Sequence, residues 1–178
     1  MMAPMTFVER MIGAAKLDVR AYEEVEADRG AMGQALAVVV LAAVAAGIGS
    51  GYQVGVVGLV GGAVANIVSW LVWAWLVWLV GTKLLREPQT SADTAELMRT
   101  IGFSASPGLL RALGVIPLLG GLIFTATTIW MLVTMVVAVR QALDLRSTGR
   151  AIVICLIGWV LHVIVFIGLL RVLRAGWA

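Results

Sequence analysis

Charged residues are scarce in this sequence, and cysteine and proline are scarcer still. Only 13% of its 178 residues are charged, whereas soluble domains carry roughly 25%. The single cysteine, Cys155, lies inside an apolar run, which excludes a disulfide framework and a cysteine-based metal site. There is also no phosphate-binding glycine loop ending in Lys-Ser/Thr and no His-Glu-x-x-His motif. We therefore expect no cofactor, no metal ion and no catalytic residue.

Apolar residues are what the sequence has in excess. They make up 61% of the chain, and the mean hydropathy is +1.01, more than the core of a soluble domain can absorb. The net charge of +3 is small, and the basic residues stand at the ends of apolar runs. This pattern is typical of membrane orientation and not of nucleic-acid binding. The sequence predicts an integral membrane protein whose first partner is the lipid bilayer.

Residues 1–30 form the most charged part of the chain. They include six acidic residues and no apolar stretch of the kind found in a cleavable signal peptide. Five apolar positions share one helical face, which predicts a short helix on the membrane surface: Phe7, Val8, Met11, Ile12 and Ala15. The alternative is a solvated tail. Asp18 is the expected N-cap of a second helix. We expect residues 1–30 to be a cytoplasmic amphipathic segment and residues 31–178 to be the transmembrane domain.

Five apolar segments follow, and they predict an all-α, polytopic transmembrane bundle with amphipathic interfacial helices. The expected spans are 31–50, 54–82, 109–116, 122–139 and 151–173. The third span must be short and broken by proline. The chain from Leu109 to Val139 has about 31 residues, whereas two helices that each cross a bilayer need roughly 40.

The distribution of basic residues predicts the topology. Eleven of the thirteen Lys and Arg residues fall in the N-terminal segment, in residues 83–111 and in residues 140–150. The positive-inside rule then gives five spans, a cytoplasmic N-terminus and a C-terminus outside, in the inner membrane if the protein is bacterial. In the rival arrangement residues 109–121 are a re-entrant or surface segment. That gives four spans and moves the 140–150 loop outside.

The stretch from Ser91 to Ile116 predicts two helices that meet at 102–107. Ser91 is the expected N-cap of the first helix, whose apolar side predicts that it lies along the cytoplasmic surface. Pro107 suits the start of the second helix, and Arg111 is expected to reach the membrane interface with its guanidinium. The candidate interfacial motif comprises Arg99, Gly102, Phe103, Pro107, Arg111 and Pro117.

Small residues recur at four-residue spacing from the end of the first expected span into the second. This spacing lets helix backbones approach closely in lipid, where helix association has no hydrophobic driving force. It favours packing within the chain, and a homo-oligomer interface is the alternative. The candidate helix-packing residues are Gly47, Gly51, Gly55, Gly58 and Gly62.

Few polar residues lie within the expected spans. Asn66 should face the bundle, because an unpaired amide in lipid costs several kcal/mol, and Trp70 should pack against neighbouring helices. Thr127 is expected to bond its own helix backbone. His162 is the only histidine, and no acid lies in another span, so a structural hydrogen bond to Asn66, a threonine or a carbonyl is favoured over a proton relay.

Several segments together resemble the Yip family, the Ypt/Rab-interacting membrane proteins, in its compact prokaryotic form. They read F-V-E-R-M-I-G-A-A-K-L-D-V-R-A-Y-E-E-V, R-T-I-G-F-S-A-S-P-G-L-L, V-I-P-L-L-G-G and T-I-W-M-L, with R-Q-A-L after them. The resemblance implies five membrane helices and a cytoplasmic N-terminus. In eukaryotic relatives it implies roles in vesicle traffic through small GTPases. Because this sequence lacks their long N-terminal region, GTPase binding is not expected here.

For function, the sequence favours a non-enzymatic membrane protein that organises a membrane complex or its local lipid environment. Its partners would be lipid, other membrane proteins or a second copy. The alternative is a small transporter or lipid-moving protein with a polar path lined by Asn66, Thr127 and His162. An intramembrane hydrolase lacks support. The stretch G-F-S-A-S-P-G at 102–108 resembles a G-x-S-x-G elbow, but Ser106 stands where the elbow has its second glycine, and no strand precedes it.

Overall fold

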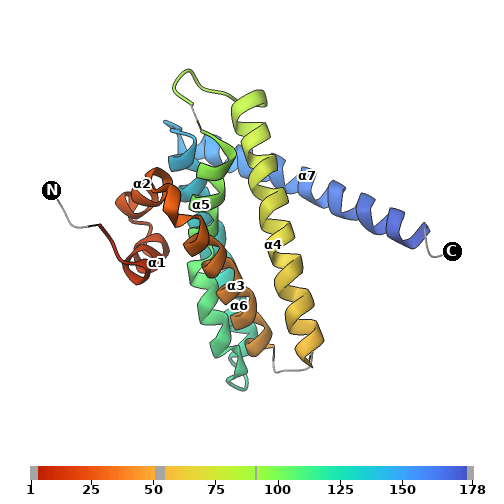
Figure 1. The fold of residues 1–178 in the computed structure, drawn as a ribbon. Coiled ribbons are helices and arrows are strands. Elements are labelled where there is room, and N and C mark those ends of the chain that lie inside the picture. The colour runs from red at the N-terminus through yellow and green to blue at the C-terminus, as the bar shows by residue number, and fades with distance from the viewer. Residues whose placement is uncertain (1–3, 51–54, 91, 176–178) are drawn as a thin grey trace.

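The structure is a computed structural model that describes residues 4–50, 55–90 and 92–175. These residues form helices and turns, with no β-strand among them. Two short N-terminal helices, α1 (Phe7–Ala15) and α2 (Val19–Ala27), lie against one side of a bundle of longer helices (Figure 1). The predicted all-α class is confirmed, and so is Asp18 as the N-cap of α2, since its carboxylate accepts a hydrogen bond from the Arg20 amide.

Within the described residues, four helices are each long and apolar enough to cross a membrane. They contain the stretches Arg29–Gly49, Val57–Leu84, Gly120–Ala142 and Thr148–Gly168. The first comprises the 3₁₀ turn η1 (Arg29–Ala31) and α3 (Met32–Gly49). The second lies in α4 (Gly55–Leu79) and the π-helical turn η2 (Val80–Leu84). The other two are α6 (Gly120–Ala142) and α7 (Thr148–Ala175).

Between α4 and α6 the chain forms α5 (Thr94–Ser104) and the 3₁₀ helix η3 (Ser106–Val115), which meet at Ala105. Two helices meeting between 102 and 107 were predicted, and Pro107 stands in the first turn of η3, where its missing N–H costs nothing. Asp93 is the N-cap of α5 and forms a capping box with Glu96. The predicted cap Ser91 lies outside the described residues.

The prediction that α5 lies along the cytoplasmic surface is wrong. Most of its second half is buried, including the Arg99 and Phe103 side chains. Gly102 faces α3, where a Cβ would come within 2.8 Å of the Ala35 Cβ, and the Trp70 indole of α4 donates to the Met98 carbonyl at 3.2 Å. Helices on several sides therefore enclose α5, and the amphipathic pattern reflects a protein interior rather than a lipid surface.

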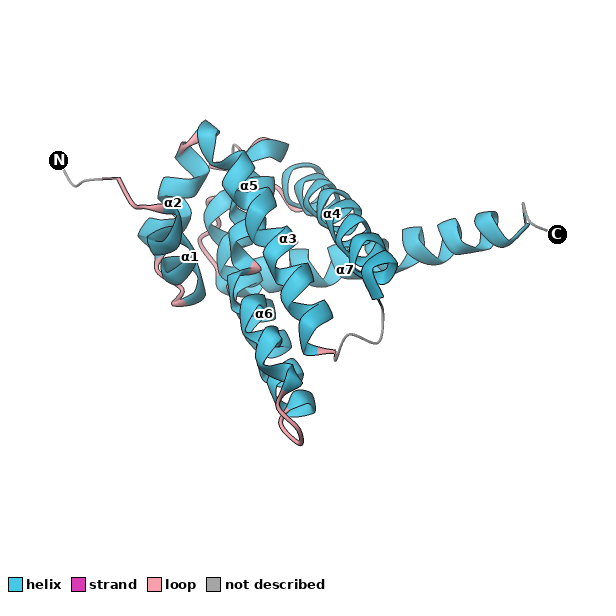
Figure 2. Ribbon diagram, turned by 60° about the horizontal axis from the view of Figure 1, so that its bottom comes forward, coloured by secondary structure: helices cyan, strands magenta, loops and turns pink. Residues whose placement is uncertain are grey.

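From α5 the chain continues along η3, between α3 and α6, to the turn at 116–119 (Figures 1 and 2). Gly114 lies against the end of α3, where an added Cβ would meet the Gly49 carbonyl oxygen at 2.9 Å. Glycine at both positions lets the two backbones touch. We call the end of α3, η3, the 116–119 turn and the start of α6 the far half of the bundle.

Helix α7 packs on α4 only along its first part. A Cβ at Gly158 would lie 3.3 Å from Val77, and His162 lies beside Trp73 with ring centroids 5.9 Å apart. Farther on, α7 leaves the bundle at a wide angle (Figure 1), and Ile164 and Phe166 are exposed. The core is shared by α2, α3, α4, α5, α6 and the first part of α7. Its largest fully buried side chains include Tyr22, Leu97, Phe103, Leu143 and Ile154.

Candidate functional site

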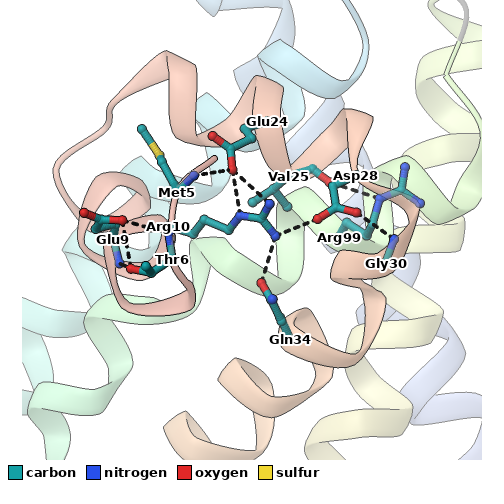
Figure 3. Close-up of polar contacts among 10 residues, drawn as sticks. All are labelled: Met5, Thr6, Glu9, Arg10, Glu24, Val25, Asp28, Gly30, Gln34 and Arg99. Atoms are coloured by element: carbon teal, nitrogen blue, oxygen red, sulfur yellow. Dashed lines mark hydrogen bonds and ion pairs between the residues drawn. The ribbon is translucent and has the colours of Figure 1, made fainter. Parts of the chain in front are cut away.

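Arg10 is the residue that holds the two N-terminal helices together. The residue is 5% exposed, and its guanidinium donates to Glu24 on α2 through Nε and Nη2, at 3.0 and 2.9 Å. Nη1 lies 2.8 Å from an Asp28 oxygen and 2.9 Å from the Gln34 amide oxygen of α3 (Figure 3). A buried charge is tolerated when its donors are satisfied in this way. Arg10 thus ties α1 to α2 and both helices to the bundle.

Aromatic side chains fasten the same two helices to α5 and α6. The Tyr22 hydroxyl lies 2.9 Å from the Ala14 carbonyl oxygen and 3.3 Å from that of Thr134. The Phe7 ring meets Phe103 edge to face at 6.2 Å. On α6, the Trp130 indole donates to the last turn of α1 at 2.8 Å. The N-terminal helices are therefore part of the folded bundle, while Val8 and Ile12 stay exposed on the outer face of α1.

Arg99 of α5 reaches the C-terminal end of α2. Its Nε donates to the Val25 carbonyl at 3.1 Å, and its Nη2 donates to the Glu26 carbonyl. Carbonyls in the last turn of a helix lack helical partners and carry partial negative charge. A buried cation satisfies them here, so Arg99 is a C-terminal clamp on α2.

Four carboxylates gather beside this clamp. They line a hollow of about 190 Å³ together with Ala27 and Gln141, and they are Glu23, Glu26, Glu96 and Asp144. Burial raises the pKa of Glu26 to about 7, with the charges of Asp144 and Glu96 acting in the same direction and Arg99 opposing them. Glu26 is therefore the acid whose charge the fold tolerates least at neutral pH.

Two loops meet at the same end of the molecule. Arg150 donates to Glu87 at 2.6 Å, and this bond is the main cause that lowers the pKa of Glu87. The Thr90 hydroxyl donates to the Leu143 carbonyl at 3.0 Å, and Gln89 donates to that of Asp144 at 3.2 Å. Residues 87–90 are therefore held against the loop 143–147 and the start of α7.

We call residues 4–31, 80–90, 92–99 and 140–150 the charged half; they include α1, α2, the start of α5 and the two loops. It contains all ten acidic residues and ten of the thirteen basic residues, the exceptions being Arg111, Arg171 and Arg174. Among the described residues, no three His, Cys, Asp or Glu side chains are arranged to hold a metal ion.

The candidate polar residues of the spans do not come together. Asn66 is exposed on α4, so the expectation that it faces the bundle is wrong. Trp70 is buried against α5, as predicted. Thr127 bonds its own helix at Ile123, also as predicted. His162 has Ser69 as its partner, 3.2 Å from Nε2, while its Nδ1 is buried without a hydrogen bond.

The candidate packing glycines divide between inside and outside. Gly47 faces Leu59 of α4 so closely that an added Cβ would collide with the Leu59 side chain. Gly55 and Gly62 have open space around them, Gly58 is exposed, and Gly51 lies outside the described residues. Packing within this chain therefore involves Gly47, whereas Gly55, Gly58 and Gly62 face outward.

The candidate interfacial residues are spread along the bundle. Arg99, Gly102, Phe103 and Pro107 are buried within it. Pro117 is exposed at the far turn. Arg111 lies in the far half, where it contacts Thr127 and Thr128 of α6. The motif thus runs from the charged half to the opposite end of the molecule.

Sequence reasoning missed Arg10 and Glu26. Both stood among the charges of a segment interpreted as a surface helix or a tail. The one usable signal concerned Arg10: it and Glu24 fall on the inward faces of two short helices joined by a tight turn. Nothing in the sequence indicated that Gln34, 24 residues away from Arg10, would complete the site.

These features define a helical integral membrane protein with two N-terminal helices docked on its bundle. The chain belongs to the Yip1 domain family, whose family model matches residues 19–170. The match begins at α2 and covers all four membrane-capable helices. None of the curated proteins and none of the solved structures searched matches the chain.

Proposed function

We propose that this protein is a non-enzymatic membrane component that binds a protein partner through its charged half and so organises a membrane complex. The observation that carries the proposal is the docking of α1 and α2. The buried Arg10 and Arg99 hold these helices in place. The two α2 carboxylates at the hollow, Glu23 and Glu26, therefore lie at fixed positions beside those of Glu96 and Asp144. A fixed array of charges favours specific recognition, since complementary potentials steer a partner and reject others.

The proposal includes five spans, with the charged half in the cytoplasm. Helix α5 has 11 residues and η3 has 10, which correspond to roughly 16 and 20 Å at α-helical and 3₁₀ rises. Together they exceed the roughly 30 Å of a hydrocarbon core. So few residues can cross because a 3₁₀ helix rises farther per residue than an α-helix does. With five spans, the positive-inside rule supports a cytoplasmic N-terminus.

A transport path has less support. Its three expected lining residues lie apart: Asn66 on the outer face of α4, Thr127 between α6 and η3, and His162 between α4 and α7. The four membrane-capable helices also offer no carboxylate as a proton or cation site, and the one carboxylate of the α5–η3 segment is Glu96, near the start of α5. The dispersal of these polar groups favours a structural role for each of them.

Site-specific photo-crosslinking in native membranes tests the partner. A photoreactive residue at Glu23 or at Asp144, both exposed around the hollow, should yield an adduct of one defined size. The same residue at Leu118, exposed on the far turn, should not. Neutralising Glu23 and Glu96 together should abolish the Asp144 adduct, and Lys16→Gln should leave it unchanged.

Reconstitution of the purified chain into liposomes tests the alternative. We expect no dye release and no lipid scrambling. Robust flux that disappears in Asn66→Leu or His162→Leu would overturn the proposal, as would the absence of any adduct at the charged half.

A further inference from the structure

Arg111 is the one charged side chain in the far half of the bundle. Residues 32–82 contain no Asp, Glu, Lys or Arg, and residues 100–139 contain only Arg111. Every acidic residue of the chain lies in the charged half. Arg111 therefore has no counter-ion in a part of the molecule that is otherwise apolar.

The guanidinium is held in place by α6. Its Nη2 donates to the Thr128 hydroxyl at 2.8 Å, and its Nε lies 3.3 Å from the Thr127 hydroxyl. Its Cζ stands 5.6 Å from the centroid of the Phe124 ring, which adds a cation–π contact. Both hydroxyls donate to carbonyls of their own helix, so they act as acceptors for the arginine. Within the described residues, Nη1 makes no hydrogen bond.

With the 116–119 turn placed at the bilayer boundary, as the five-span proposal requires, helix geometry puts this charge below the membrane surface. Arg111 precedes the end of η3 by a few residues, roughly 10 Å at the 3₁₀ rise, and Thr128 lies roughly 12 Å along α6 from Gly120. The headgroup layer is only roughly 6 Å thick. Because Thr127 and Thr128 hold the guanidinium against α6, the side chain does not extend past the turn to bulk water. A cation at this depth is costly without an anion beside it.

The site is open to the side. Thr128 is exposed and Arg111 is partly exposed, and the neighbouring Leu113 and Leu122 present apolar surface, at 50% and 67% exposure. A bilayer supplies one abundant anion at this boundary, the phosphodiester of a phospholipid. The planar fork of arginine matches two phosphate oxygens.

We propose that Arg111, positioned by Thr127 and Thr128, binds the phosphate of an anionic phospholipid from the leaflet nearer the 116–119 turn. The acyl chains lie along the apolar surface of η3 and α6. Anionic headgroups are preferred because the far half has no carboxylate to pair with the ammonium of a zwitterionic lipid. The site is independent of partner binding, which involves the opposite half of the molecule.

Titration of the delipidated full chain with phosphatidylglycerol, followed by native mass spectrometry, tests this site. We expect one tightly held lipid per chain. Arg111→Gln should weaken its affinity at least tenfold, and Arg111→Lys less, since charge is kept and the fork is lost. Arg29→Gln removes an exposed arginine of the charged half and should change nothing. Phosphatidylcholine should bind several-fold more weakly, and millimolar inorganic phosphate should not displace the lipid.

Wild-type lipid affinity in Arg111→Gln would overturn the proposal, since the arginine would then only connect η3 to α6. Displacement by inorganic phosphate would overturn the lipid assignment in favour of a free oxyanion, and equal affinity for phosphatidylcholine would overturn the headgroup preference. Thr128→Val removes one exposed hydroxyl and keeps the side-chain volume. It should weaken binding several-fold, and if Arg111→Gln does not fold, undiminished affinity in Thr128→Val refutes the site.

Discussion

At the scale of single residues, Glu26 makes the stability of the charged half depend on pH. Its pKa rises from an ordinary value of 4.5 to about 7 on folding, chiefly through burial. A raised pKa means that the folded state binds the proton more tightly than the unfolded state does. The stabilisation is therefore complete below pH 4.5 and is lost as the pH rises to about 7.

We expect Glu26→Gln to remove this loss. Thermal unfolding of the wild type in detergent should occur at lower temperature at pH 8 than at pH 5, whereas the variant should change little. At pH 8 the variant should be more stable by about 1 kcal/mol, after allowance for partial solvent screening. Glu9→Gln is the control, because hydrogen bonds from Thr6 lower the pKa of Glu9 and its titration lies below this window. A Glu26→Gln profile as steep as the wild type would contradict the assignment.

At the scale of elements, the N-terminal helices depend on Arg10 for their docking. Arg10→Gln would leave Glu24 and Asp28, which are 28% and 39% exposed, without their cation. We expect a loss of about 1–3 kcal/mol in the stability of the docked helices. Limited proteolysis between 16 and 31 should become at least several-fold faster. Lys16→Gln removes an exposed charge of the same segment and should leave the cleavage rate unchanged, and equal rates in all three proteins would disprove the clamp.

The contact between α3 and α5 depends on a glycine. A Cβ at Gly102 would approach the Ala35 Cβ to 2.8 Å and the Ala35 backbone to 3.2 Å. We expect Gly102→Ala to lower the free energy of unfolding by about 1–2 kcal/mol, because overpacking outweighs the better helix propensity of alanine. Gly62→Ala is the matched change in open space on α4 and should be neutral or stabilising by up to about 1 kcal/mol. Unfolding midpoints in the reverse order would refute this packing.

At the scale of the whole molecule, the number of crossings decides where the C-terminus lies. With five spans, a reporter fused after Ala178 is outside and one inserted after Asp144 is cytoplasmic. With four spans the two locations are exchanged, so the pair of fusions forms its own control. We expect alkaline phosphatase to be active only after Ala178 and a cytoplasmic fluorescent reporter only after Asp144. The opposite result would show that residues 94–115 do not cross the bilayer.

The sequence by itself determined what depends on local bonding and on bulk composition. Apolar content decided the membrane class, because no soluble core absorbs so much of it. The Asp18 cap and the bonds of Thr127 to its own helix are both formed within four residues along the chain, so local spacing is enough to predict them. The junction near Pro107 follows from the same short-range rules.

The tertiary structure alone decided which side of each helix is inside. An amphipathic pattern does not distinguish a lipid surface from a protein interior, and for this reason α5 was predicted at the surface although α3, α4 and α6 enclose it. The partners of Arg99 and His162 are 74 and 93 residues away, at separations where many pairings satisfy the same side chain. The contacts of Arg111 with Thr127 and Thr128 also depend on tertiary packing, because they join η3 to α6. The significance of Arg111 as a lone charge became visible only when folding placed every carboxylate in the other half.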